Sequence, residues 1–142
     1  MNSPRFFEYV FRVPFHQVDG AGVLFFAHLF THAHDAYERF MQNLDSSLDR
    51  LLRESRYDLP IVHAAADYRL PLRHGMEVRV HMGVDRLGDT SFTTAYDFIG
   101  PGGERYAHLE LVHCCTQRDT HRKTPVPIEL RKQLQPYVHN KP

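Results

Sequence analysis

The segment from Phe15 to Leu44 constrains the fold most, because it joins a glycine-rich turn to a long helical pattern. A strand-like stretch ends at Asp19-Gly20-Ala21-Gly22, and apolar residues then recur at spacings of three and four. This spacing predicts a helix from about Phe26 to Asn43 with one apolar stripe, which must be buried against a broad surface. The stripe comprises Phe26, Leu29, Phe30, Ala33, Tyr37, Phe40, Met41 and Leu44.

Alternating apolar and polar residues predict strands on both sides of this helix. The first runs from Phe7 to Phe15, and the period of two returns after Leu59. The later strands are expected at 62–70, 76–84, 92–98 and 104–117, with a hairpin at Gly100–Gly103 before the last one. Residues 45–58 are expected to form a short helical turn or loop with Leu48, Leu51 and Leu52 inward, and a short helix lies near Ile128–Leu134.

We therefore predict an α+β fold in which residues 1–142 form one domain, a length sufficient to bury one core. Short connections favour antiparallel pairing, so a curved sheet wraps around the one long helix. A single helix covers only one sheet face, which leaves strand edges and a mixed face around His63, Asp67 and Arg69 in need of partners. We expect at least a dimer with a continuous sheet, and a tetramer as the full assembly.

Charge and composition exclude several classes of protein. The 17 basic and 17 acidic residues give no net charge, which argues against a nucleic-acid surface. No apolar run approaches a membrane-spanning length, and the first residues lack the apolar core of a signal peptide. Cys114 and Cys115 are neighbours, which point to opposite faces of a strand, so no disulfide joins them. Reduced thiols indicate a cytoplasmic protein.

Two stretches of the chain resemble the hotdog-fold acyl-CoA thioesterases of the 4-hydroxybenzoyl-CoA thioesterase type. The first is Val18-Asp19-Gly20-Ala21-Gly22-Val23, followed by Phe25-Phe26 and the helix. The second, Leu59–His63 with Ala66–Pro71, is similar to the 1,4-dihydroxy-2-naphthoyl-CoA hydrolase branch. The resemblance implies that Asp19 is the catalytic carboxylate and that the backbone N–H of Phe26 holds the thioester oxygen. A related branch for short-chain or carrier-bound acyl groups has His at the position of Phe26, so its absence favours aromatic substrates.

The residue types agree with this chemistry. Asp19 is able to attack the thioester carbonyl or to activate water, and the sequence leaves both roles open. The start of a helix offers unpaired N–H groups and a partial positive charge for an oxyanion. The alternative interpretation is that Asp19 has only a structural role, in which its side chain caps the glycine-rich turn.

The substrate contacts are predicted around the same turn. Gly22 permits a close approach of the backbone to substrate, and Phe25 and Phe30 supply an apolar wall beside Phe26 for a flat aryl group. His63 is a candidate for a hydrogen bond to a ring hydroxyl, or else a polar residue on a wet sheet face. The phenylalanines are alternatively plain core residues.

Basic residues and histidines remain to be assigned. Arg118, Arg122 and Lys123, with His121, form the densest basic cluster and are candidates for the coenzyme A phosphates, or are simply solvated. His28, His32 and His34 suggest a helix that binds a metal ion. However, no Glu follows the first histidine, as it does in the metal-binding helix of zinc peptidases. We expect solvated or interface histidines, no metal and no cofactor.

Three functions remain from this sequence. The first is an acyl-CoA thioesterase acting on an aromatic, hydroxylated acyl group. The second is a non-catalytic hotdog module that binds acyl-CoA or an acyl carrier protein, although binding alone does not require the carboxylate of Asp19. The third is a thioesterase that acts on an aliphatic acyl-CoA. A hotdog dehydratase is disfavoured, because the sequence contains no matching His-plus-acid motif.

Overall fold

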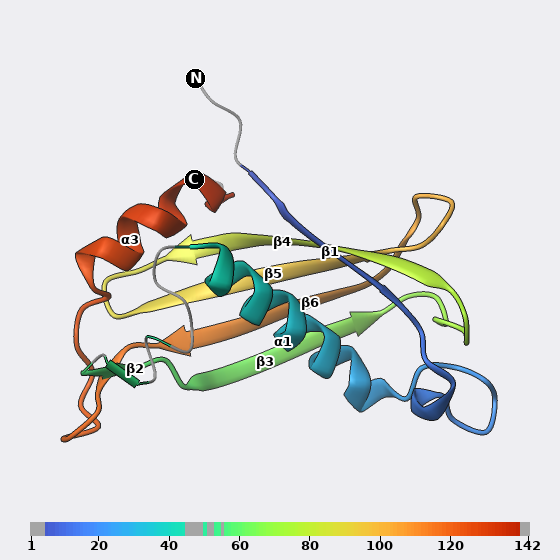
Figure 1. Cartoon of the computed structure of the whole chain (residues 1–142), viewed down its shortest axis with the longest axis horizontal. Helices are drawn as coiled ribbons and strands as arrows, with labels where there is room; N and C mark the ends of the chain where they lie inside the picture. The colour runs from blue at the N-terminus through green and yellow to red at the C-terminus, as the bar shows by residue number, and fades with distance from the viewer. Residues whose placement is uncertain (1–4, 45–49, 51–52, 55, 140–142) are drawn as a thin grey trace.

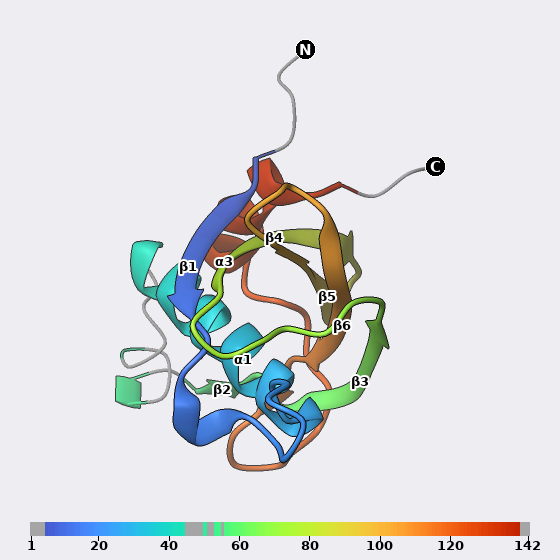
Figure 2. The same cartoon turned by 90° about the vertical axis from the view of Figure 1, so that its right-hand side faces the viewer.

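The computed structural model describes residues 5–44, 50, 53–54 and 56–139. Helix α1 (Phe26–Asn43) lies inside a curved five-stranded antiparallel sheet (Figure 1). Figure 2 shows the sheet curling around α1, so that its first and last strands flank the helix. The predicted α+β fold and the bounds of its central helix are confirmed. The predicted inward positions of Leu48, Leu51 and Leu52 lie outside the described residues.

The main sheet has the strand order β1-β4-β5-β6-β3, which leaves β1 and β3 at the edges. Its strands are β1 (Phe7–Arg12), β3 (Ile61–Tyr68), β4 (Glu77–Leu87), β5 (Ser91–Ile99) and β6 (Arg105–Cys114). A small second sheet pairs β2 (Tyr57–Asp58) with β7 (Thr116–Gln117). The other helical segments are η1 (Phe15–Gln17), α3 (Ile128–Leu134) and η2 (Gln135–Tyr137).

The first and the last strand of the main sheet along the chain end earlier than predicted. The first ends at Arg12, because Pro14 lacks the N–H that a ladder needs and the chain enters η1 at Phe15. The last main strand ends at Cys114. The main-chain groups of Cys115 instead bond to Thr90 and Thr124, which turns residues 116–117 toward β2.

The core lies between α1 and the concave face of the sheet. Alternate residues of β4 and β5 are fully buried there, and α1 contributes Leu29, Ala33, Tyr37, Phe40 and Met41. Each buried large apolar side chain contributes about 1.5–3 kcal/mol to folding. The predicted stripe differs at its ends, because Phe26 is 61% exposed and Leu44 half-buried, whereas His32 is buried.

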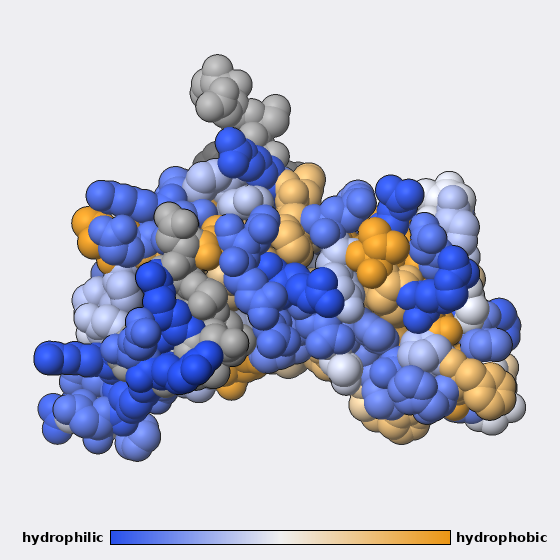
Figure 3. Space-filling model, in the orientation of Figure 1, coloured by the Kyte–Doolittle hydropathy of each residue, from blue (hydrophilic) through white to orange (hydrophobic). Residues whose placement is uncertain are grey.

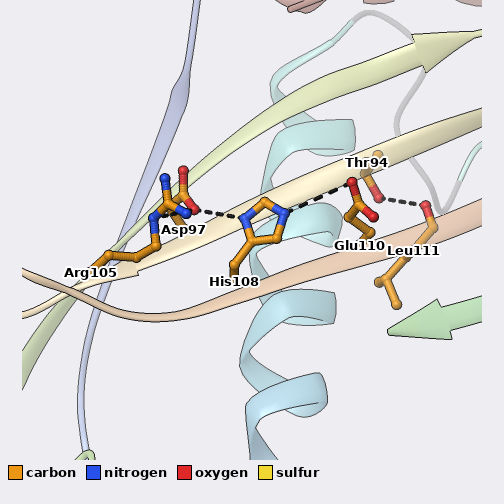
Figure 4. Close-up of polar contacts among 6 residues, drawn as sticks. All are labelled: Thr94, Asp97, Arg105, His108, Glu110 and Leu111. Carbon is orange, nitrogen blue, oxygen red and sulfur yellow. Dashed lines mark hydrogen bonds and ion pairs between the residues drawn. The ribbon is translucent and has the colours of Figure 1, made fainter. Parts of the chain in front are cut away.

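The convex face of the sheet carries a row of alternating acids and histidines. Strand register places one residue of the row on each strand, namely Glu8, His81, Asp97, His108 and Asp67. Figure 4 shows the centre of this face, where His108 Nδ1 lies 2.8 Å from Asp97 Oδ1 and His108 Nε2 lies 3.9 Å from Glu110 Oε1. Polar side-chain pairs across neighbouring strands stabilise a sheet by about 0.2–1 kcal/mol each. We interpret this row as a structural device on the face away from α1.

Strand β3 is an exposed edge. Its residues separate into the two faces that the sequence predicts, since Ala64, Ala66 and Tyr68 pair with residues of the concave face. Nevertheless, every residue of β3 except the half-buried Ala66 is exposed in the single chain. An edge with free main-chain groups and apolar side chains is a template for pairing with another chain.

Candidate active site

The Asp19 turn is a narrow loop whose two arms are joined by main-chain hydrogen bonds. The Phe25 N–H donates to the Gln17 carbonyl at 2.9 Å, and the Asp19 N–H donates to the Val23 carbonyl at 2.8 Å. Phe25 directly precedes α1, so Asp19 lies only one step of this ladder away from the start of the helix. The sequence prediction that Asp19 and the helix start are neighbours is consistent with this ladder.

The Asp19 carboxylate has one oxygen committed to the turn. Its Oδ1 accepts hydrogen bonds from the N–H groups of Ala21 at 2.9 Å and Val23 at 3.1 Å. No partner for Oδ2 lies among the described residues, and the side chain is exposed. Gly22 has φ of 77°, a left-handed conformation that only glycine adopts without steric cost. The carboxylate therefore caps its own loop and still offers one oxygen to a substrate.

The first turn of α1 presents free main-chain donors. Within the described ranges, no side chain caps the helix at Phe25, and the first turn contains no acidic residue. The N–H of His28 bonds to the Phe25 carbonyl, which leaves those of Phe26 and Ala27 without an acceptor in the described residues. These donors lie at the positive end of the helix dipole, where an oxyanion is stabilised.

The loop after β3 supports the Asp19 turn from one side. The Leu24 N–H donates to the Leu72 carbonyl at 2.7 Å, and Val23 forms an isolated antiparallel bridge with Arg73. Tyr68, the last residue of β3, donates its hydroxyl proton to the Phe26 carbonyl at 2.9 Å. The two stretches of sequence that carry the family resemblance are thus in contact in the structure.

An apolar pocket opens where these segments meet. It has a volume of about 210 Å³ and is lined by Val23, Leu24, Leu29, Tyr68, Arg69, Leu70, Pro71, Leu72 and Ala107. An apolar cavity of about 150 Å³ is able to hold benzene, so this pocket has the size of a substituted aryl ring. Sequence reasoning missed this lining, because it combines the Asp19 turn, α1, β6 and the loop after β3, which no local pattern connects.

The predicted aromatic residues lie near this pocket but outside its lining. The rings of Phe25 and Phe26 are 4.8 Å apart and are 44% and 61% exposed. Phe30 is half-buried. At the end of the molecule that carries the Asp19 turn, Figure 3 shows hydrophobic atoms among hydrophilic ones. Within the described residues, Gly22, Phe25 and Phe30 belong to the surroundings of the pocket rather than to its wall.

His63 and the basic cluster are not brought to this pocket by a single chain. His63 pairs with Val112 on the convex face, opposite to the face that Tyr68 shares with α1. Arg118 directly follows β7 and forms an ion pair with Asp58 of β2 at 3.0 Å. Figure 1 shows β2 at the end of the molecule opposite to the Asp19 turn. A polar pocket of about 480 Å³ occurs there, lined by Arg56, Tyr57, Gln117, Arg118 and Asp119. Arg122 and Lys123 are exposed in the adjoining loop.

His32 departs from the prediction that the helix histidines are solvated or lie at an interface, because it is buried within the single chain. Its ring is 6% exposed and stacks on Phe11 with centroids 3.7 Å apart. Its Nε2 lies 2.7 Å from Oε1 of Gln17, a residue of η1. Burial lowers the pKa of His32, although nearby Asp35 opposes this shift. His32 is therefore a packed, neutral contact between α1 and the Asp19 loop.

No group of three acidic, histidine or cysteine side chains suited to a metal ion is found in the described ranges. His34 is exposed and His28 half-buried. Within those ranges, likewise, no helix has the length and apolar character needed to span a bilayer. The site thus offers an acid, main-chain donors and an apolar pocket.

Known proteins share this fold and are similar to this chain over most of its length. Residues 13–134 match the thioesterase-like superfamily. A 1,4-dihydroxy-2-naphthoyl-CoA hydrolase from Thermosynechococcus vestitus is 32% identical over 130 residues, which cover 92% of this chain and 89% of that protein. A 1,4-dihydroxy-2-naphthoyl-CoA thioesterase structure from Synechocystis has a TM-score of 0.86 and 24% identity, covering 92% of this chain and 96% of that one. A gentisyl-coenzyme A thioesterase structure has a TM-score of 0.80 and 24% identity, covering 89% and 98%. At these identities the two structures establish the fold alone.

Proposed function

The chain belongs to the thioesterase-like superfamily, and from this premise we propose that it hydrolyses the thioester of an aromatic acyl-coenzyme A. The observation that carries the proposal is the meeting of three features at one end of α1. These are Oδ2 of Asp19 and the N–H groups at the start of the helix, which have no partner among the described residues, and the apolar pocket. Relatives named as 1,4-dihydroxy-2-naphthoyl-CoA hydrolases support the aromatic acyl group.

In this reaction the N–H of Phe26 binds the carbonyl oxygen as negative charge develops on it. One such donor contributes about 2.7–4 kcal/mol to lowering the barrier. Because the donor belongs to the main chain, the apolar side chain of Phe26 does not interfere. The Ala27 N–H, which is also unpaired among the described residues, is placed to assist.

Asp19 supplies the attacking group in one of two ways. As a nucleophile, its oxygen bonds to the carbonyl carbon, the C–S bond breaks, and coenzyme A leaves as the thiol after protonation. Water then hydrolyses the resulting anhydride. As a general base, Asp19 removes a proton from water, and that water attacks the carbonyl carbon; the C–S bond then breaks, and coenzyme A leaves as the thiol with the proton that Asp19 took up. Oδ1 remains bound to the turn in both cases, which holds the reactive Oδ2 in place.

The exposed β3 edge supports a dimer in which two copies pair β3 antiparallel. Val62 and Tyr68 on this edge are 62% and 52% exposed. Antiparallel pairing sets the start of β3 in one chain beside the end of β3 in the other. The start adjoins the Arg118 region, and the end adjoins the Asp19 turn. Each copy would therefore bring its basic loop to its partner's pocket, and two such dimers would form the expected tetramer.

This arrangement gives the coenzyme A phosphates a place. Arg122 and Lys123 are exposed and carry the charges for the phosphates, while Arg118 holds its loop to Asp58. Cys114 and Cys115 are free and buried, which supports a reducing, cytoplasmic location.

The decisive experiment is a panel of acyl-coenzyme A thioesters assayed with a thiol-detecting dye, for the wild type and Asp19→Asn. Asparagine keeps the Oδ1 acceptor that caps the turn but is unable to act as base or comparable nucleophile. We expect kcat on aryl thioesters to fall at least about a hundredfold, with unchanged thermal unfolding and unchanged binding of free coenzyme A.

Each alternative has its own outcome in this panel. Tight coenzyme A binding without turnover of any thioester would indicate a binding module instead. Faster cleavage of hexanoyl- or palmitoyl-CoA than of benzoyl- or naphthoyl-type thioesters would indicate an aliphatic thioesterase. An Asp19→Asn variant with nearly full kcat would remove Asp19 from the mechanism. Incorporation of ¹⁸O from labelled water into Asp19 during turnover would identify the nucleophilic route.

A further inference from the structure

Tyr68 is the aromatic residue that joins the candidate pocket to the start of α1. It is the last residue of β3, and its cross-strand partner Ala107 is buried on the concave face. Its hydroxyl donates to the Phe26 carbonyl at 2.9 Å, and its side chain lines the pocket together with Leu29. Tyr68 therefore contacts both the helix turn that holds the oxyanion and the space for the acyl group.

The hydrogen bond to Phe26 decides what Tyr68 offers to a ligand. A phenol has one proton to donate and two lone pairs to accept. Its single proton is already donated to the Phe26 carbonyl, so only lone pairs remain for the pocket. Burial raises the pKa of Tyr68, so the hydroxyl keeps its proton at neutral pH.

The rest of the lining makes this acceptor distinctive. Apart from Tyr68 and Arg69, the side chains that line the pocket are aliphatic. A guanidinium donates hydrogen bonds and accepts none. Among the described lining residues, Tyr68 thus provides the side-chain acceptor that a hydroxyl on the substrate is able to use.

We propose that Tyr68 accepts a hydrogen bond from a ring hydroxyl of the acyl group and thereby selects hydroxylated aryl thioesters over plain ones. This inference rests on the proposed function and assigns a specificity-determining residue to it. A site that pairs with a substrate hydroxyl disfavours the analogue that leaves its polar group unpaired. Tyr68 takes the part for which His63 was a candidate, since His63 lies on the opposite face of β3.

The test compares matched pairs of substrates that differ only in ring hydroxyls. kcat/KM is measured for 4-hydroxybenzoyl- and benzoyl-CoA, and for 1,4-dihydroxy-2-naphthoyl- and 2-naphthoyl-CoA, with the wild type, Tyr68→Phe and Tyr106→Phe. Tyr106 is a half-buried tyrosine of β6 outside the pocket lining and serves as the matched control. Inhibition by the non-hydrolysable thioether analogues of each pair gives a second readout that does not require turnover.

We expect the wild type to prefer at least one hydroxylated partner by about tenfold or more, the worth of one hydrogen bond. Tyr68→Phe should abolish this preference by losing activity on the hydroxylated member, and Tyr106→Phe should keep it. An equal loss on both members would assign Tyr68 only to the Phe26 carbonyl and would overturn the inference while leaving the hydrolase function intact. Preference retained by Tyr68→Phe in both readouts would also overturn it. A wild type without turnover of any aryl thioester would overturn the proposed function as well.

Discussion

Nε2 of His32 lies 2.7 Å from Oε1 of Gln17, and this contact ties the second turn of α1 to the arm of the Asp19 loop. The main-chain carbonyl of the same Gln17 accepts the Phe25 N–H, immediately before the helix begins. A short path of hydrogen bonds thus leads from a buried histidine to the residue that precedes the proposed oxyanion donor. We therefore infer that His32 and Gln17 position that donor.

We predict that His32→Ala lowers kcat about fivefold and leaves KM nearly unchanged, because one hydrogen bond of about 1 kcal/mol holds the loop against the helix. Gln17→Ala should have a similar effect, and the double variant should be little worse than either single one. Steady-state kinetics of the four proteins would measure this. His32→Gln supplies an amide N–H in place of the ring N–H of histidine and should recover part of kcat. Additive losses in the double variant would show that the two residues act independently.

The second prediction concerns Gly22 in the same loop. A Cβ added at Gly22 meets nothing within 4 Å, so Gly22→Ala costs only the strain of its φ of 77°. A non-glycine residue in this region costs about 1–2 kcal/mol. Gly20 provides the control, because its Cβ also meets nothing and its backbone needs no positive φ. Urea unfolding should show a loss for Gly22→Ala and almost none for Gly20→Ala; equal losses would rule out the backbone explanation.

Local patterns predicted the elements of this fold well. The three-and-four spacing located α1, and the period of two separated the faces of β3 and β4, since both depend only on neighbouring residues. The Gly100–Gly103 turn was equally local, and the Gly100 N–H bonds to the Glu104 carbonyl there. What the patterns lacked was the position of each element in the sheet. Strand β3 alternates like a half-buried strand, yet in the single chain all of its residues except the half-buried Ala66 are exposed.

The sequence predicted two parts of the candidate site, Asp19 and the start of α1, because these two parts lie close together in the sequence. The pocket was not predicted, because Leu29 and Leu72 come together only through the tertiary path of the chain. His32 was misplaced for the same reason, since its partner Gln17 is 15 residues away and outside the helix. His63 was a candidate for a hydrogen bond to a ring hydroxyl of the substrate. A single chain does not support this role, because the register of β3 turns His63 to the convex face.

The third prediction is a loss of stability in mild acid that depends on His113. This residue is fully buried between Tyr37 and Phe92, and burial lowers its pKa to about 4. In the unfolded chain the pKa is about 6.5, so between these values the unfolded state binds the proton and the native state does not. Stability is therefore complete above pH 6.5 and falls as the pH drops toward 4, by up to about 3 kcal/mol.

Unfolding free energies measured from pH 7 to 4 for the wild type and His113→Gln would check this. Glutamine does not titrate, so its variant should show a shallower slope, whatever its stability at pH 7. The exposed His121, in the loop after β7, provides the control, and His121→Gln should keep the slope of the wild type. Parallel curves for all three proteins would exclude His113 as the origin of the acid sensitivity.

The fourth prediction addresses the β3 edge. In Figure 3 the lower outline of the molecule is indented, and Figure 1 shows β3 along this side. In an antiparallel pair of identical strands, residues near the middle of β3 face their own copies. Ala64→Asp sets two carboxylates near each other across that pair and should raise the dimer dissociation constant at least about tenfold. Val10→Asp adds the same charge at an exposed site of β1, the other edge strand, and should not. Sedimentation velocity of the three proteins separates these outcomes, and a monomeric wild type at micromolar concentration would contradict the dimer.

The last prediction concerns Arg122 and Lys123, which the proposed dimer brings to the pocket of the other chain. Exposed cationic side chains that contact phosphates raise the affinity for the ligand, and added salt weakens this contribution because it screens the charges. The double variant Arg122→Gln/Lys123→Gln should therefore raise KM for an acyl-coenzyme A about tenfold at low salt, with less effect at 0.5 M salt and little change in kcat. The corresponding acyl-pantetheine lacks the nucleotide phosphates, so its KM should not change. Lys132→Gln on α3, another exposed lysine, is the matched control. An equal rise in KM for both substrates would place the basic loop at the acyl or pantetheine part of the ligand instead, because only the nucleotide distinguishes the two.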